Sequence, residues 1–275
     1  MANQKAIKVD EDYIERCNIQ GIYPAAYYPH NIHFLWFASS MEGRSKVSID
    51  AARKLVIKTP KSMLSVVPRL ERYFTMPYFS LIRFGKWDEV LKEAKPDEDL
   101  LYATLMWHYA RGMAFANKGK IKKAKKELKL VKAGSSNEAL QALDKPNYPT
   151  INLSKMATLM LTAEIVGKKG KLGEKIALIK EAVAIQDGLR YSEPPHFYYP
   201  VRQSLGAALL ADNKAAAAEL IFKEDLAKFP RNGWSLFGLH QSLIKQQKME
   251  EAKEIEKEFE TAWSLADVEL EQAVL

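Results

Sequence analysis

Cysteine is almost absent from this chain, since Cys17 is the only one among 275 residues. A single cysteine cannot form an intramolecular disulfide or supply the paired cysteines of a zinc site. Long apolar runs are also lacking: none approaches the roughly 20 residues that a membrane-spanning helix needs. The first residues alternate charged and apolar side chains, unlike the apolar core of a secretory signal. We therefore expect a soluble, cytoplasmic protein with no membrane insertion.

The positive charge of the chain, +7 in total, is concentrated between residues 118 and 132, which include eight lysines. Apolar residues recur within this stretch at steps of three and four, the spacing of an amphipathic helix: Ile121, Ala124, Leu128 and Val131. The lysines then fall on the solvent side of the helix. The stretch lacks the arginine and aromatic residues that accompany lysine in nucleic-acid sites. We expect a solvated helix face and no nucleic-acid partner.

Internal repetition is the strongest pattern in the sequence. Residues 204–230 align with residues 238–263, so that Leu205 and Leu239 lie 34 residues apart, as do Ala218 and Ala252. A period of 34 residues is typical of tetratricopeptide (TPR) helix pairs. Several further residues match the small, aromatic and proline positions of that repeat: Gly206, Leu209, Phe222 and Pro230. Small residues at such positions let two antiparallel helices approach closely.

The same pattern extends towards the N-terminus, with turns between paired helices expected at Gly43, Gly85, Gly119, Gly170 and Asn213. Some spacings exceed the period, and extra residues in a repeat array leave it as loops. We therefore predict an all-α, single superhelical domain over 1–275, with five to six helix pairs, regular repeats at about 67–132 and 200–265, and inserts at about 133–150 and 187–200. The later insert combines prolines with aromatic residues, so we expect it to be ordered against the array.

Three segments resemble a largely uncharacterised group of bacterial TPR proteins: YYPHNIHFLWFASSMEGRS, YSEPPHFYYPVRQSLGAALL and NGWSLFGL. The resemblance covers nearly the whole chain and implies a right-handed α-solenoid of bacterial origin. Members of the group are longer and carry further helix pairs before this point. The chain begins with what resembles the end of a repeat, so we expect it to be the C-terminal part of such a protein. The group supplies no established activity and no catalytic residues.

The first helices of TPR-like pairs line the concave surface of the array, where a ligand would bind. Aromatic, methionine and a few polar residues occupy these positions: His30, His33, Phe37, Arg72, Phe79, Arg83, Met106, Tyr109, Met113, Asn117, Met160, Glu164, Gln203, Phe237 and Gln241. The mixture suits a peptide, a partner protein or a small ligand whose carboxylate Arg72 or Arg83 would hold. The alternative is that the aromatic and methionine residues belong to the core between repeats.

Two sets of residues leave a catalytic or metal-dependent function open. His30 and His33 lie on one helical face and could both ligate a metal, together with a glutamate, His108 or His196, although no third ligand is specified. Glu193 and His196 in the later insert could form an acid–base pair. Nucleophile-elbow, phosphate-loop and zinc-helix motifs are absent from the sequence. We therefore predict a binding or scaffold module without cofactor or catalytic residues, with a metal- or ligand-dependent enzyme or sensor as the alternative.

Overall fold

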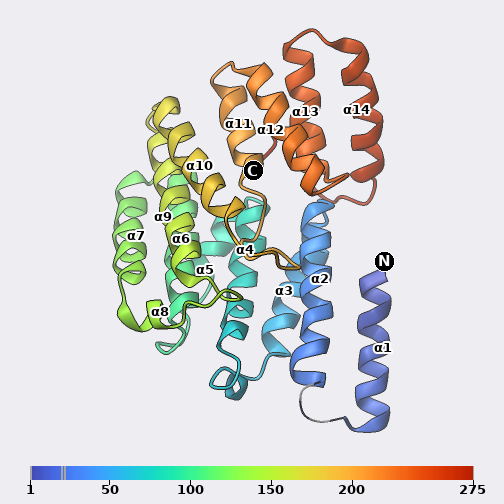
Figure 1. The fold of residues 1–275 in the computed structure, drawn as a ribbon, viewed down its shortest axis with the longest axis vertical. Helices are drawn as coiled ribbons and strands as arrows, with labels where there is room; N and C mark the ends of the chain where they lie inside the picture. Colours follow the sequence, from blue (N-terminus) through green and yellow to red (C-terminus); the bar gives the residue numbers. More distant parts are fainter. Residues whose placement is uncertain (1, 20, 22, 275) are drawn as a thin grey trace.

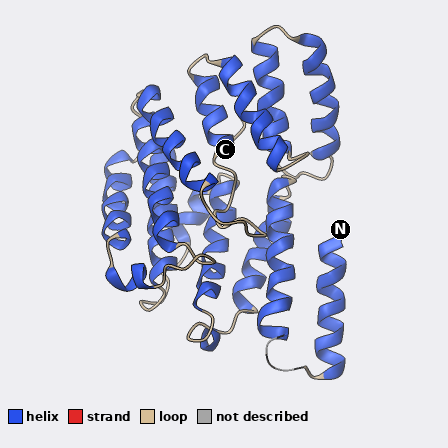
Figure 2. Ribbon diagram, viewed as in Figure 1, coloured by secondary structure: helices blue, strands red, loops and turns tan. Residues whose placement is uncertain are grey.

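Fourteen α-helices make up most of the described chain, residues 2–19, 21 and 23–274, in this computed structural model. They are α1 (Ala2–Cys17), α2 (Tyr28–Met41), α3 (Ser45–Ile57), α4 (Met76–Arg83), α5 (Trp87–Lys92), α6 (Leu101–Asn117), α7 (Ile121–Ser135), α8 (Glu138–Ala142), α9 (Thr150–Gly167), α10 (Leu172–Asp187), α11 (Arg202–Ala211), α12 (Ala215–Lys228), α13 (Gly233–Lys245) and α14 (Met249–Ala262). Figure 2 shows no strand in this part of the chain. No described helix combines the length and apolar character needed to cross a membrane.

Helices that follow each other in the sequence pack against each other, as Figure 1 shows. The pairs are α2 with α3, α4 with α5, α6 with α7, α9 with α10, α11 with α12, and α13 with α14. The N-terminal helix α1 packs on α2 at one edge of the array. The expected all-helical architecture of paired helices is confirmed, and this arrangement is compatible with an α-solenoid.

The turns between paired helices lie where the repeat spacing predicts them. All five expected positions have a left-handed backbone, with φ between 57° and 78°: Gly43, Gly85, Gly119, Gly170 and Asn213. Gln247 also has a positive φ, of 61°, and lies 34 residues after Asn213. Glycine adopts this conformation without a steric penalty, and asparagine tolerates it better than most residues. The position of each turn is therefore encoded locally.

The inserts form short helices that support the longer ones. The segment between α3 and α4 contains two 3₁₀ helices, η2 (Lys61–Met63) and η3 (Pro68–Thr75). Glu71 in η3 accepts hydrogen bonds from the backbone N–H groups of Tyr102 (2.8 Å) and Ala103 (3.1 Å), at the start of α6. The hydroxyl of Tyr148, from the insert before α9, donates to the same carboxylate at 3.1 Å. One buried carboxylate thus connects two inserts to the N-terminus of α6.

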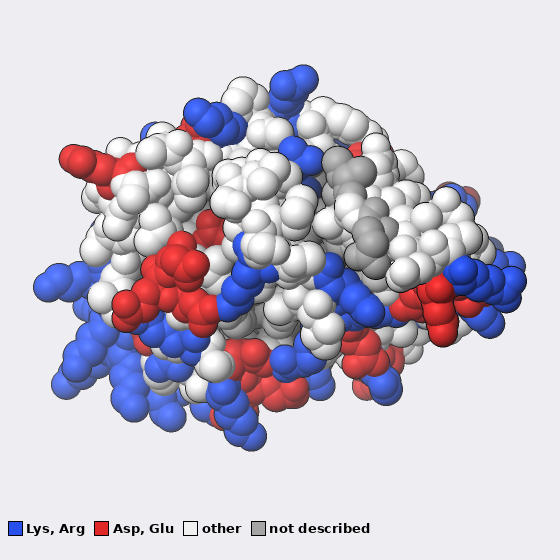
Figure 3. All heavy atoms as spheres, turned by 90° about the horizontal axis from the view of Figure 1, so that it is seen from below, with Lys and Arg blue, Asp and Glu red and all other residues white. Residues whose placement is uncertain are grey.

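The lysine-rich helix α7 presents its charges to solvent, as its periodicity predicts. All eight lysines between residues 118 and 132 are exposed, whereas Ala124 and Val131 are buried. Figure 3 shows basic side chains gathered at the left edge of the molecule, the side on which α7 lies in Figure 1. This surface is accounted for by an amphipathic helix on the outside of the array.

The last helix pair contacts the first pair of the array, which the repeat pattern does not predict. Trp234 of α13 is fully buried, and its indole N–H donates to the backbone carbonyl of Ser40 in α2 at 2.8 Å. The ring of Trp263, just after α14, packs on Gly43 and Gly233 so closely that neither position has room for a Cβ atom. Two tryptophans therefore join the ends of the array.

The residues after α14 return to the first pair as an irregular segment, 263–274, named here the tail. Its Asp267 carboxylate accepts hydrogen bonds from the backbone N–H groups of Ser45 (2.5 Å) and Lys46 (3.0 Å), which begin α3. The backbone N–H of Asp267 donates to the carbonyl of Gly43 at 3.1 Å. Further along, Ala273 is buried, and Figure 1 shows the described end of the tail near α11 and α4.

Close packing around Phe222 makes Gly206 intolerant of a larger residue. A Cβ atom at Gly206 would lie 2.4 Å from the Phe222 ring, which is fully buried and also packs on Gly238. Gly206→Ala should therefore lower the free energy of unfolding, because a steric cost of roughly 1–3 kcal/mol exceeds the helix-propensity gain of about 1 kcal/mol. Urea unfolding measures the change. Gly173→Ala is the matched control, since that position in α10 opens onto free space, and equal effects of the two substitutions would contradict this packing.

Asp267→Ala should loosen the tail and destabilise the fold by roughly 1 kcal/mol, the typical effect of losing a helix cap. Burial works to raise the pKa of Asp267, but hydrogen bonds from Lys46 and Ser45 outweigh it and lower the pKa. The stabilisation is therefore present above the ordinary aspartate pKa of about 4 and is lost as the pH falls through the lowered value. Urea unfolding of parent and variant should differ at pH 7 and converge in acid. Glu269→Ala, in the same tail, is the control, and a pH-independent difference would argue against the cap.

Candidate functional site

The hollow between the first helices is filled by a segment of the chain itself, residues 190–201, named here the inner segment. Figure 1 shows it crossing the middle of the molecule between α10 and α11. Its prolines prevent a continuous helix. At the C-terminal end, the side chain of Gln186 donates to the carbonyl of Tyr199 (3.0 Å) and accepts from the N–H of Val201 (2.8 Å). The expectation that this insert is ordered against the array is confirmed.

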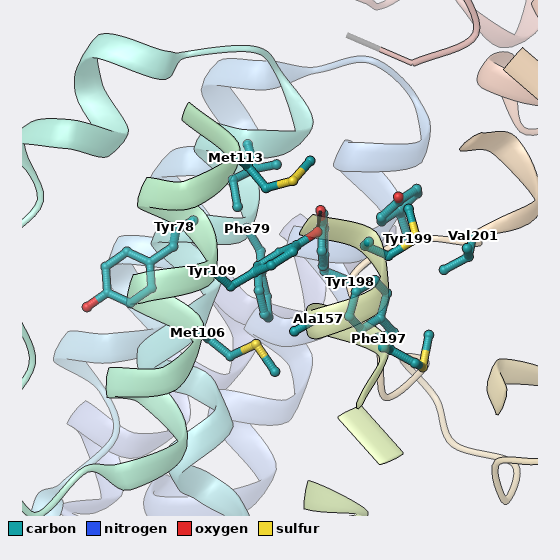
Figure 4. Packing of buried hydrophobic residues seen from close by; sticks show 14 of the residues in the cluster. Tyr78, Phe79, Met106, Tyr109, Met113, Ala157, Phe197, Tyr198, Tyr199 and Val201 are labelled. Carbon is teal, nitrogen blue, oxygen red and sulfur yellow. Dashed lines mark hydrogen bonds between the residues drawn. The ribbon is translucent and has the colours of Figure 1, made fainter. Parts of the chain in front are cut away.

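Aromatic rings of the inner segment pack against predicted groove residues, as Figure 4 shows. Tyr198 stacks on Phe79 of α4, with ring centroids 4.4 Å apart and planes 11° apart. Its hydroxyl lies 3.0 Å from the hydroxyl of Tyr109 in α6. Phe197 and Tyr199 are buried beside it. Phe79 and Tyr109 thus contact a peptide segment, but one that belongs to the same chain.

Arg83, at the end of α4, is buried at the centre of these contacts, with only 5% of its surface exposed. Its guanidinium carbon lies 3.7 Å from the ring centre of Trp234 and 5.2 Å from that of Tyr199. One guanidinium nitrogen donates to the side-chain oxygen of Gln203 at 2.5 Å. Burial lowers the pKa of Arg83 to about 10, so it remains charged at neutral pH.

Gln203 connects Arg83 to a second buried charge, Asp225 of α12. Its amide donates to the Asp225 carboxylate at 3.2 Å and to the side chain of Asn232 at 3.1 Å. Ser235 donates to the same carboxylate oxygen, Oδ2, at 2.6 Å. Burial raises the pKa of Asp225, although these hydrogen bonds oppose the change. Arg83 and Gln203, both predicted to face a ligand, therefore already have polar partners within the fold.

Several predicted groove residues surround a cavity of about 150 Å³, named here the inner cavity. Side chains from α4, α6 and α9 line it together with the tail: Arg83, Met113, Asn117, Glu164, Gln272 and Val274. The amide of Asn117 donates to the carbonyl of Met113 at 3.1 Å. Residues that the sequence analysis assigned to the groove are thus neighbours in space, and the tail lies against them.

Glu164 is the acidic residue of the inner cavity, and two lysines hold it. Its carboxylate pairs with Lys168 at 3.3 Å and with Lys175 at 3.0 Å. Burial works to raise the pKa of Glu164, but the two lysines outweigh it and lower the pKa. The carboxylate is therefore ionised at neutral pH and fully paired, which makes this wall of the cavity polar but not strongly charged.

Three further predicted groove residues are grouped here with His196 of the inner segment as the histidine–arginine cluster: His30, His33, Arg72 and His196. His33 is buried in α2, stacked on Trp36 with ring centroids 5.3 Å apart. Both of its ring nitrogens lack a hydrogen-bond partner within the described residues, as do Arg72 Nε and His196 Nε2. Burial lowers the pKa of all three histidines, and the charge of Arg72 acts in the same direction.

A second cavity, of about 520 Å³, lies between α2, the inner segment and the end of α12. Its walls include Phe37, Glu193, His196 and Phe229, and the Phe37 and Phe229 ring centroids are 6.3 Å apart. Glu193 accepts a hydrogen bond from the hydroxyl of Tyr191. The volume is within the range of small-molecule pockets. No hydrogen bond joins Glu193 to His196 in the part of the chain described, so their pairing as acid and base stays a prediction.

The histidines considered for a metal site are not joined by a third ligand in the described chain. Nowhere in residues 2–19, 21 and 23–274 do three His, Cys, Asp or Glu side chains gather as a metal site would require. His108 is engaged elsewhere, because its Nδ1 lies 2.7 Å from the Glu127 carboxylate, which also accepts from Arg111 at 3.0 Å. His30 and His33 share a helix face, as predicted, but His33 lies between the rings of Trp36 and Tyr73.

Sequence reasoning missed Asp225, Trp234 and the tail as parts of this region. Asp225 lies in an amphipathic helix among exposed charges, so nothing in its pattern distinguishes it. Trp234 is the second residue of α13, after the N-cap Asn232, a position that gives no indication of its distant partner Ser40. The aromatic and proline content of the inner segment was the one sequence feature that indicated an ordered segment packed against the helices.

Comparison with known proteins assigns no family to this chain. No protein-family model, no curated protein and no solved structure matches it. The account of its function therefore depends on the geometry of its own side chains.

Proposed function

We propose that the chain is a binding module whose concave face holds an extended peptide of a partner protein. In this proposal the helix pairs are TPR-like repeats of a right-handed superhelix. The repeat period of 34 residues, the left-handed turns and the close approach of Phe222 to Gly206 support that assignment. Arrays of this kind recognise peptides through side chains of the helices that line the groove.

One observation carries the proposal: the hollow already holds two irregular segments of its own chain. The inner segment packs its aromatic rings on α4 and α6, and the tail places Gln272 and Val274 against the inner cavity. Surfaces that accommodate non-helical chain offer both apolar contacts and polar partners for a backbone. In this proposal a peptide from another protein contacts the part of that surface which the two segments leave open, at the inner cavity.

A peptide-display library panned against the full chain tests the proposal, with fluorescence anisotropy of the selected peptides as the readout. Ala207 of α11 lines the inner cavity, and Ala207→Trp should weaken binding at least tenfold, which corresponds to about 1.4 kcal/mol. Ala216→Trp, on the exposed side of α12, should change affinity less than twofold. Circular dichroism checks that both variants are folded. A library that yields no binder, or a binder indifferent to Ala207→Trp, contradicts the proposal.

A further inference from the structure

Four unpartnered polar atoms mark the histidine–arginine cluster as unusual within the molecule. They are His33 Nδ1, His33 Nε2, Arg72 Nε and His196 Nε2, all shielded from solvent. A buried polar atom without a partner costs free energy, so such atoms in folded proteins are rare and call for a missing partner. Half of the eight buried unpartnered side-chain atoms in the described chain belong to these three residues.

The three residues belong to one neighbourhood. His33 and Arg72 both contact the ring of the buried Tyr73, with the His33 ring centre at 5.1 Å and the Arg72 guanidinium carbon at 5.5 Å. The charge of Arg72 acts on His33 and also on His196 of the inner segment. Two further charged residues, Arg69 and Glu193, act on the neighbouring His30.

Arg72 brings a permanent positive charge to this neighbourhood without a balancing carboxylate. No Asp or Glu of the described chain forms an ion pair with Arg72. Its sequence neighbour Glu71 instead accepts hydrogen bonds from Tyr102, Ala103 and Tyr148. An arginine in a partly buried site without a counter-charge is a common way of holding a carboxylate or phosphate. The cluster therefore has the charge and the free hydrogen-bonding atoms of an anion site.

Charge balance selects a carboxylate over a phosphate. Burial and Arg72 lower the pKa of His33 well below its ordinary value and that of His196 to about 4, so both rings are neutral at pH 7. A neutral imidazole offers one N–H donor and one acceptor. His196 makes a hydrogen bond to the backbone of Arg190, which leaves its Nε2 as the acceptor. A single positive charge matches a monoanion, and the acceptor on His196 suits an N–H of the same ligand.

We propose that Arg72, His33 and His196 form a binding site for a carboxylate group that carries a neighbouring N–H, as in an acylated amino acid or the C-terminus of a peptide. Arg72 and the N–H of His33 hold the carboxylate, and His196 Nε2 accepts from the ligand N–H. A cation is disfavoured here because it would lie beside Arg72. The site does not depend on peptide binding at the inner cavity.

Histidine-selective NMR of the full chain, titrated with N-acetylglycine at pH 7 and constant ionic strength, tests this site. We expect saturable shifts of the His33 and His196 ring signals and none at His108 or His240. N-acetylglycinamide, which lacks the carboxylate, and inorganic phosphate should bind at least tenfold more weakly. N-acetyl-triglycine distinguishes the two sources of the ligand: tighter binding assigns a peptide terminus, and equal binding assigns a small acid.

Three variants show whether the named residues form the site. Arg72→Gln should weaken N-acetylglycine binding at least tenfold, whereas Arg69→Gln, an equal charge change at an exposed position three residues earlier, should change it less than twofold. His33→Phe keeps a ring on Trp36 and should fold normally while also losing affinity tenfold. No saturable shift, an unchanged affinity in both Arg72→Gln and His33→Phe, or tighter binding of phosphate overturns the proposal.

Discussion

The buried guanidinium of Arg83 constrains the rest of the structure, because burying a charge costs free energy unless other groups pair with it or bond to it. Gln203 supplies a hydrogen bond, Trp234 and Tyr199 supply ring faces, and Asp225 supplies the opposite charge through Gln203. These partners come from α11, α13, the inner segment and α12. Four parts of the chain must therefore be in place together before Arg83 can be buried.

This requirement accounts for the closed interior of the molecule. Trp234 can stack on Arg83 only when α13 lies over α4, and in that position its indole reaches Ser40 of α2. Tyr199 reaches Arg83 only when the inner segment enters the hollow. The helix pairs form an outer wall, and the polar network at Arg83 connects that wall to the segments inside it. Two of the cavities that remain beside these segments are the inner cavity and the second cavity.

The repeat pattern predicted the wall of this molecule but not its interior. Gly43, Gly85 and Gly119 were identified as turns from the repeat pattern, and each has the left-handed backbone that favours glycine. The contact of Arg83 with Gln203 joins residues 120 positions apart, and no period of 34 specifies it. A repeat predicts which face of a helix turns inward. It does not predict that another segment fills the hollow.

The prediction of the site has the same limit: the repeat indicates which residues face inward, but not which of them have partners within the fold. Counting along the first helices selected Met113, Asn117 and Glu164 as inward-facing neighbours, and they do surround one cavity. The same count could not separate Arg83, whose guanidinium donates to Gln203 inside the fold, from Arg72, whose side chain makes no hydrogen bond to the described residues. That difference depends on the inner segment, which lies outside the repeat pattern, and on Asp225 of α12, whose role the repeat does not specify.

A double-mutant cycle between Arg83 and Asp225 tests most directly whether this network holds the interior together. Arg83→Met and Asp225→Asn each leave one buried charge without its counterpart, and each should destabilise the fold by about 3 kcal/mol in urea unfolding. The double variant removes both charges, so its loss should be smaller than the sum of the two by more than about 1 kcal/mol. Additive losses, equal to the sum within roughly 0.5 kcal/mol, would contradict the account.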